Sequence, residues 1–226
     1  MQHLHTFCVI CHEHSTRMKR RGIMVRKTAY SLAIVTFFIF CFMWVNLNHT
    51  VVQNIDRIAV DWFKDNSFLA IFHYFGEPWF VVTVGIIIMV VLWLRMRDYR
   101  LMLFLLATFG GGAALNQILK NIIERPRPER IEQLMSYSFP SGHSMSGMIY
   151  LLATVYIVTK YINFERKEWM VWLGAFILAI LIGISRVAES RHFGSDVIAG
   201  LSLGFTWFML CVYWYELCDK AIKHTT

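Results

Sequence analysis

Three short polar motifs in the second half of the chain interrupt an otherwise apolar sequence and carry residue types that can do chemistry. In order, they are Lys120 with Arg127-Pro128, then Pro140-Ser141-Gly142-His143, then Ser185-Arg186 with His192 and Asp196. Together they supply cations, two histidines and a carboxylate. Such groups can hold an anion and move protons around it.

The cations of these motifs are suited to a phosphate group. Lys120, Arg127 and Arg186 supply three positive charges. Arginine forks match phosphate oxygens two at a time, whereas a lysine ammonium acts as a point charge. No carboxylate cluster in the neighbouring loops suggests a divalent cation site. We therefore expect these side chains, rather than a metal ion or another cofactor, to neutralise a bound phosphate.

The two histidines are expected to have different tasks. His192 and Asp196 stand four residues apart, so on a helical turn they share a face. A carboxylate on one ring nitrogen fixes the tautomer and leaves the other nitrogen free to attack. His143 has no such carboxylate nearby in sequence, so it can hold a proton for a leaving oxygen.

The second motif lies where a polar loop meets a long apolar run. Ser141 is a good N-cap residue for the helix expected there. A helix start offers unpaired N–H groups and a positive dipole end to an anion, and Gly142 allows close backbone approach.

The elements that must position these motifs are membrane helices. The chain has 226 residues, of which 57% are hydrophobic and 16% charged, too apolar for an ordinary soluble domain. Six apolar runs are long enough to cross a hydrocarbon layer of ~30 Å. They are residues 29–48, 78–95, 101–119, 144–161, 169–187 and 196–217. We expect an all-α, polytopic membrane protein with six transmembrane helices.

Charge placement predicts the orientation of these spans. Most of the 22 lysines and arginines lie in the segments that share a side with the two termini. The positive-inside rule therefore predicts a cell-membrane protein with both termini in the cytoplasm. The net charge of +7 then marks the inner membrane face and does not indicate a nucleic-acid partner.

The same alternation brings all three motifs to the extracytoplasmic side. They close the third span, open the fourth, close the fifth and open the sixth, and a bundle can bring these four ends together. Each motif also has an ordinary structural reading: Lys120 and Arg127 as interface cations, Asp196 as a helix cap, Ser185-Arg186 as a helix end. These readings do not explain why so many charged groups gather where a membrane protein favours neutrality.

The remaining segments suggest a simple domain organisation. We expect a cytoplasmic tail over residues 1–28, a membrane domain over 29–217 and a second cytoplasmic tail over 218–226. The first tail holds potential metal ligands, but their spacing differs from usual zinc layouts, so a disordered tail, or an extension ahead of a start at Met18 or Met24, is favoured. These ligands are His3, His5, Cys8, Cys11, His12 and His14.

Two further patterns predict how the bundle is packed. The outer segment 49–77 carries apolar residues at helical spacing, including Ile58 and Trp62, and predicts short interfacial helices. Small residues permit close helix approach in a membrane. They occur at 110–114 in the third span and as Gly200 and Gly204 in the last.

The three motifs, in this order, resemble those of the type 2 phosphatidic acid phosphatase family, which also includes the lipid phosphate phosphatases. The family patterns K-x6-R-P, P-S-G-H and S-R-x5-H-x3-D are all intact here. The resemblance is close over residues 100–200, and the six-span layout extends it over residues 30–217.

The resemblance implies metal-independent phosphoryl transfer through a phosphohistidine at the outer membrane face. In that scheme His192 is the nucleophile, Asp196 orients it and His143 is the general acid. The groups that hold the phosphate are Lys120, Arg127, Arg186, Ser141 and the Gly142 amide. Bacterial members of this length hydrolyse phosphatidylglycerol phosphate, undecaprenyl pyrophosphate, phosphatidate or diacylglycerol pyrophosphate, so we expect a membrane lipid phosphate as the substrate.

Two alternatives remain at the level of sequence. A phosphotransferase would use the same motifs, since only the acceptor differs from water. An anion transporter would place its polar groups near the middle of the membrane, often within inverted repeats. Here the polar groups lie at the rim of the spans and no repeat is visible, which disfavours transport.

Overall fold

A computed structural model describes residues 27–128, 136–162 and 167–223, and all secondary structure within these ranges is helical. The expected first tail, with its histidines and cysteines, lies almost wholly outside the described residues. The helices are Lys27–Val45, α2 (Thr50–Phe63), α3 (Ser67–Ala70), η1 (Ile71–Gly76), α4 (Pro78–Val91), η2 (Leu92–Met96), α5 (Tyr99–Ile123), α6 (Gly142–Tyr161), α7 (Glu168–Ala188) and α8 (Gly194–Lys223).

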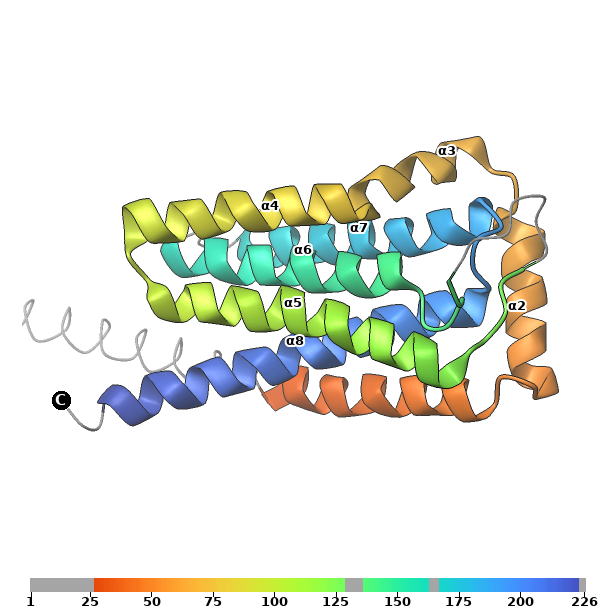
Figure 1. The fold of residues 1–226 in the computed structure, drawn as a ribbon, viewed down its shortest axis with the longest axis horizontal. Helices are drawn as coiled ribbons and strands as arrows, with labels where there is room; N and C mark the ends of the chain where they lie inside the picture. The colour runs from red at the N-terminus through yellow and green to blue at the C-terminus, as the bar shows by residue number, and fades with distance from the viewer. Residues whose placement is uncertain (1–26, 129–135, 163–166, 224–226) are drawn as a thin grey trace, which may run out of the picture.

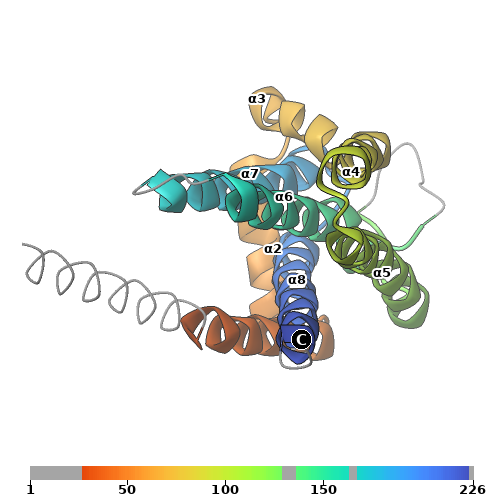
Figure 2. The same cartoon turned by 90° about the vertical axis from the view of Figure 1, so that its left-hand side faces the viewer.

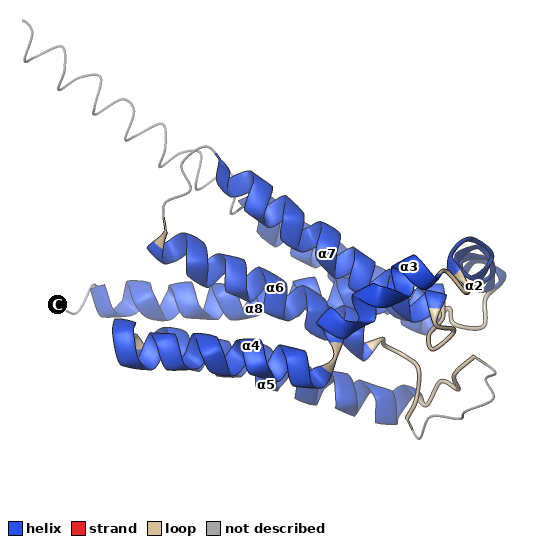
Figure 3. Cartoon of the chain, turned by 90° about the horizontal axis from the view of Figure 1, so that it is seen from above, coloured by secondary structure: helices blue, strands red, loops and turns tan. Residues whose placement is uncertain are grey.

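The long helices run along a common direction and form a bundle, seen from the side in Figure 1 and from above in Figure 3. Viewed from one end of the bundle, α6 and α8 lie near the middle, with the first helix beside α8, α7 beside α6, and α4 and α5 together on one side (Figure 2). Helix α2 does not follow the bundle direction and crosses one end of it (Figure 1). This end carries the starts of α6 and α8 and the ends of α5 and α7.

Five of the described helices are long and apolar enough to cross a membrane. They are Lys27–Val45, Pro78–Met96, Tyr99–Ile123, Glu168–Ala188 and Gly194–Cys218. These correspond to five of the six expected spans. Large apolar side chains such as Trp79, Val82 and Ile86 are exposed along α4, where water would disfavour them and lipid would not.

The remaining expected span, residues 144–161, corresponds to α6, which has 20 residues but whose most apolar stretch falls short of those of the other five. Ten of its residues are buried, including Ser144 and Gly147. Helix α6 contacts α4, α5, α7 and α8, so little of its surface meets the surroundings. A helix enclosed in this way can carry small and polar residues and still lie at membrane depth.

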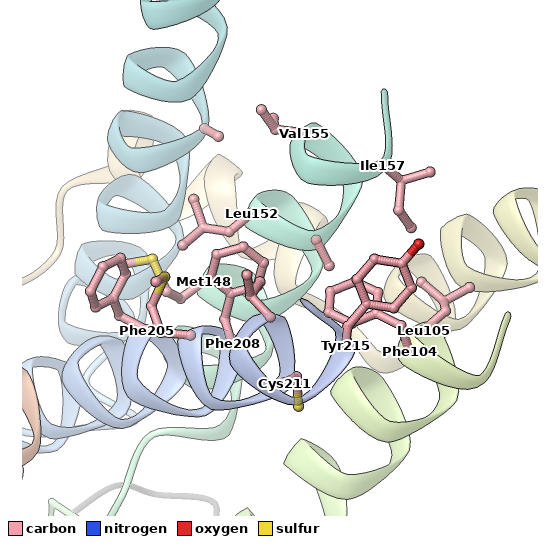
Figure 4. Close-up of a cluster of buried hydrophobic side chains, with 14 of the residues drawn as sticks. Phe104, Leu105, Met148, Leu152, Val155, Ile157, Phe205, Phe208, Cys211 and Tyr215 are labelled. Carbon is pink, nitrogen blue, oxygen red and sulfur yellow. The ribbon is translucent and has the colours of Figure 1, made fainter. Parts of the chain in front are cut away.

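The core lies where α5, α6, α7 and α8 meet. One buried cluster includes Phe104 from α5, Leu152 from α6, and Phe208 and Tyr215 from α8. Figure 4 shows these side chains between the helices. Their packing fixes the four helices whose ends carry the three motifs.

Glycines allow α8 to approach α6 closely, as the sequence predicted. A Cβ at Gly200 would lie 2.6 Å from the Ser141 carbonyl oxygen, and one at Gly204 would lie 2.8 Å from the Met145 carbonyl oxygen. At Gly112 of α5 it would lie 2.5 Å from the Ile149 side chain. At Gly110, in contrast, it would meet nothing within 4 Å, so that glycine is not needed for close approach.

Residues 49–77, between the first two expected spans, form short helices, as predicted. The side chain of Asn66 caps α3 by accepting from the Leu69 N–H, and Pro78 occupies the first turn of α4. In α2 the apolar residues Ile58 and Trp62 are exposed, whereas Asp56 is buried against the bundle. The side of α2 that faces the protein thus carries Asp56 beside the buried Val52, while the other polar residues of the helix are exposed.

Candidate active site

The three motifs meet at the end of the bundle that α2 crosses. The Ser141 N–H donates to the Asp196 carbonyl oxygen at 3.0 Å, which joins the second motif to the third. Arg127 Nη1 lies 3.3 Å from His192 Nε2 and donates to the Arg191 carbonyl oxygen at 2.9 Å, which joins the first motif to the third. The expected convergence of four helix ends is present in the structure.

His192 is held in the short turn between α7 and α8. Its N–H donates to the Arg186 carbonyl oxygen at 3.2 Å, and its side chain is 2% exposed. Nδ1 lies 3.4 Å from Asp196 Oδ2. Burial lowers the pKa of His192 to about 4, against the opposing effect of Asp196. The ring is therefore neutral at neutral pH, with Nε2 directed toward Arg127.

Asp196 lies in the first turn of α8 and is fully buried. Its Oδ2 accepts the Phe193 N–H at 2.9 Å, in addition to facing His192. A buried carboxylate is stable only when its oxygens are paired. These contacts fix its orientation toward the imidazole.

Three cations from the motifs interact with one another beside the two histidines, and we call Lys120, Arg127 and Arg186 the cation cluster. Arg186 is 2% exposed, and its Nε has no hydrogen-bond partner among the described residues. A buried N–H donor without a partner indicates an anion or water at that point. The Lys120 side chain is also buried, and it interacts electrostatically with the other two cations. Burial lowers the pKa of Arg127, although the Asp196 charge opposes this shift.

The second motif forms the start of α6, as predicted. Ser141 is the N-cap, and its hydroxyl accepts the Ser144 N–H at 3.4 Å. Asn116 of α5 donates to the Pro140 carbonyl oxygen at 3.4 Å and fixes the loop from the other side. A Cβ at Gly142 would approach Asn116 Oδ1 to 3.2 Å, so the glycine allows this tight packing.

His143 has a carboxylate partner that the sequence did not reveal. Its Nε2 lies 3.2 Å from Glu77 Oε1. Glu77 is the N-cap residue of α4 and comes from a distant part of the chain. A second carboxylate, Glu189, accepts from Arg186 Nη1 at 2.6 Å and lies 3.2 Å from His73 Nδ1.

Sequence reasoning missed Glu77 and Glu189 because their partners lie on other elements or across a helix end. One signal was available for Glu77: it is a carboxylate placed directly before an apolar span, a position that disfavours charge. Within the described residues, no group of three or more His, Cys, Asp or Glu side chains is arranged to hold a metal ion.

The fold and the site define a multi-pass membrane protein with a cationic, histidine-containing cluster at one end of its bundle. The chain belongs to the PAP2 superfamily, whose sequence profile matches residues 100–220. This confirms the resemblance drawn from the three motifs.

Individual relatives agree with this assignment. Phosphatidylglycerophosphatase B of Bacillus subtilis is 41% identical over 111 residues, which cover 48% of this chain and 55% of the relative. Lipid A 1-phosphatase of Rhizobium etli is 31% identical over 134 residues, covering 54% of this chain and 52% of the relative. The undecaprenyl-diphosphatase of Sulfolobus acidocaldarius is 29% identical over 119 residues, covering 48% and 52%. The chain thus spans about half the length of these curated relatives.

A solved structure matches over more of the chain. It is the crystal structure of a transmembrane PAP2 type phosphatidylglycerolphosphate phosphatase from Bacillus subtilis, with a TM-score of 0.71 and 31% sequence identity. The match covers 81% of this chain and 96% of that one.

Proposed function

We propose that this protein is an integral membrane lipid phosphatase that hydrolyses a phosphomonoester or diphosphate through a phosphohistidine, without a metal ion. The observation that carries the proposal is the setting of His192. Its Nδ1 faces Asp196, and its Nε2 faces the cation cluster. A neutral imidazole with one nitrogen paired to a carboxylate has its lone pair on the other nitrogen.

The first step is attack by His192 Nε2 on the phosphorus atom. The N–P bond forms while the bond from phosphorus to the leaving oxygen breaks, and the imidazole becomes positively charged. Asp196 compensates for this charge through Nδ1–H. Arg127, which contacts Nε2, lies where it can also contact a phosphate bonded to that atom. Lys120 and Arg186 complete the neutralisation.

The leaving oxygen takes its proton from His143. Burial and the neighbouring cations lower the pKa of His143, so His143 must take up its proton together with the phosphate, whose negative charge favours the protonated imidazole beside Glu77. In the second step a water loses its proton to the now neutral His143 and attacks phosphorus. The N–P bond breaks, phosphate leaves and the site is restored.

The start of α6 supplies the remaining phosphate contacts. Ser141 and the Gly142 N–H stand at the positive end of the helix dipole. The unpartnered Arg186 Nε supports a phosphate in this region. Arg186, which pairs with Glu189, would exchange that contact for one with the phosphate.

The proposed topology has six spans, with α6 as the fourth. Both termini lie in the cytoplasm, residues 29–217 form the membrane domain between tails at 1–28 and 218–226, and the site opens at the extracytoplasmic face. The named activities of the relatives support a lipid phosphate as substrate, with phosphatidylglycerol phosphate or an isoprenyl diphosphate favoured. Transfer of the phosphoryl group to another acceptor would use the same site.

The test is phosphate release by purified protein from phosphatidylglycerol phosphate, undecaprenyl pyrophosphate, phosphatidate and a soluble phosphomonoester. His192→Ala should abolish release from every substrate, while EDTA should leave the unmodified protein active. His49→Asn is the matched control, because His49 is exposed and caps α2, and asparagine retains that cap. Activity surviving in His192→Ala, or strong inhibition by EDTA, would contradict the mechanism. Adding a candidate acceptor and analysing the products separates hydrolysis from transfer.

A further inference from the structure

One buried cation at the site belongs neither to the cation cluster nor to the motif positions. Arg125 lies between Lys120 and Arg127 in the sequence, in the segment that follows α5. Its guanidinium packs over the Phe193 ring, with the carbon Cζ 4.2 Å from the ring centroid. Its side chain is 12% exposed.

The donors of Arg125 are directed at carboxylates. Nη1 donates to Asp196 Oδ1 at 2.5 Å and to the Ser195 hydroxyl at 2.7 Å. Nη2 donates to Asp56 Oδ2 at 2.7 Å. The guanidinium therefore bridges the carboxylate behind His192 and a carboxylate of α2.

Asp56 closes this network from the other side. Its Oδ1 accepts the Ser195 N–H at 2.8 Å, so α2 contacts the first turn of α8 directly. One guanidinium thus lies between two carboxylates, and each carboxylate has a backbone N–H partner as well. Such charge-assisted pairs have strict geometry, because arginine presents its donors in a rigid fork.

This arrangement separates Arg125 from the phosphate. Arg127 contacts Nε2 of His192, whereas Arg125 contacts the Asp196 oxygen that does not face the ring. Both terminal nitrogens of Arg125 are occupied by protein acceptors. The two arginines of the segment 125–127 therefore have different partners on opposite sides of the same histidine–aspartate pair.

We propose that Arg125 is a positioning residue that acts with Asp56 of α2 to hold Asp196 in the orientation that aligns His192 for attack. In this scheme the outer helix α2 forms part of the catalytic support, because its carboxylate fixes the far end of the guanidinium. The inference deepens the proposed function and rests on His192 being the nucleophile.

The experiment compares Arg125→Gln, Arg125→Lys and Asp56→Asn by kinetics on a short-chain phosphatidate in detergent, with vanadate as a phosphate-like inhibitor. Arg125→Gln should lower kcat by about 10–100-fold, the same order as the loss when the hydrogen-bond partner behind a metal-bound histidine is removed. KM and the vanadate inhibition constant should change less than threefold, because the cation cluster is intact.

The pH profile distinguishes positioning from a general loss of structure. The charged groups that face Asp196 are His192 from the turn before α8, Arg125 from the segment after α5, and more distantly Lys120 and Arg127. Without Arg125 the Asp196 carboxylate is free to turn away from His192, and since Asp196 opposes the burial that lowers the pKa of His192, the acid limb of kcat/KM should move to lower pH. Arg125→Lys keeps the charge and should return the limb toward its original position while kcat stays low.

Asp56→Asn should lower kcat about 10-fold and have little further effect in the Arg125→Gln background, since both act through the same contact. Arg57→Gln is the matched control, because Arg57 is exposed on the same helix turn and bonds only to Asn54 among the described residues. It should behave as the unmodified protein. Size-exclusion profiles and thermal unfolding show whether each variant folds.

Two results would overturn the inference. Unchanged kcat and pH profile in folded Arg125→Gln would show that Asp196 needs no such support. A raised KM and weaker vanadate inhibition with unchanged kcat would make Arg125 a phosphate ligand instead.

Full activity in His192→Ala would refute the proposed function itself, whereas an inactive His192→Ala beside an unaffected Arg125→Gln would refute the positioning role alone. If Arg125→Gln does not fold, Arg125→Lys and Asp56→Asn apply the same criteria.

Discussion

The close packing of α8 on α6 predicts a large effect from a single added methyl group, Gly200→Ala. The new Cβ would lie 2.6 Å from the Ser141 carbonyl oxygen and 2.9 Å from Ser144 Cβ, whereas ordinary contacts begin at 3.4 Å. The first of these neighbours is backbone and cannot rotate away. The two helices must therefore separate by about 0.8 Å at this point.

This separation would open the site, because the two helix starts carry different parts of it. Gly200 lies one turn after Asp196 on α8, and Ser141 directly precedes Gly142 and His143 on α6. A misplacement of this size can lower a rate by ~10²-fold. Overpacking should also lower the free energy of unfolding by about 1–3 kcal/mol.

The assay is phosphate release per folded molecule, together with thermal unfolding of the same samples. Gly204→Ala is a useful comparison, because its Cβ would lie 2.8 Å from the Met145 carbonyl oxygen, one turn further from the site. It should destabilise the protein similarly and reduce activity less. Gly110→Ala is the control, since its Cβ would meet nothing within 4 Å and alanine favours the helix by about 0.5–1 kcal/mol. Wild-type activity in Gly200→Ala would refute the reasoning.

Two further predictions concern the histidines. Glu77→Gln removes the carboxylate beside His143 and should slow release from alkyl phosphates by about 10–100-fold, because an alkoxide needs a proton to leave. Release from p-nitrophenyl phosphate, which has a good leaving group, should change much less, and equal losses on both substrates would contradict the acid role. Because burial lowers the pKa of His192 to about 4, the ring stays neutral well below the usual histidine range, and kcat/KM should persist to about that pH. The unfolded histidine binds its proton at higher pH than the folded one, so stability from this group is present above pH ~6.5 and falls as pH decreases toward 4. Thermal unfolding at a series of pH values, compared with His192→Gln, measures this loss.

The positions of the motif residues could be predicted because each depends on local sequence and on the direction of one span. Apolar length places a helix end, and the charge bias fixes which ends share a side. Ser141 as an N-cap and the i, i+4 pairing of His192 with Asp196 are local properties of a helix start. These features required no knowledge of how the helices cross.

Other residues could not be placed because their partners are set by tertiary packing. Glu77 meets His143 only because α4 begins beside the start of α6, and Asp56 meets Arg125 only because α2 crosses the end of the bundle. The amphipathic pattern of α2 also did not reveal which face of the helix is turned toward the protein. In a membrane protein the surroundings are also apolar, so Trp62 can face outward while Asp56 is buried.

Helix α4 links the bilayer around the protein to the contact between Glu77 and His143. It has no buried residue along Pro78–Val91, yet Glu77 at its start is the partner of His143. A helix held so loosely by protein takes its tilt partly from the thickness of the bilayer. Reconstitution into lipids of graded acyl length should therefore change the turnover number, because a change in the tilt of α4 moves Glu77 relative to His143.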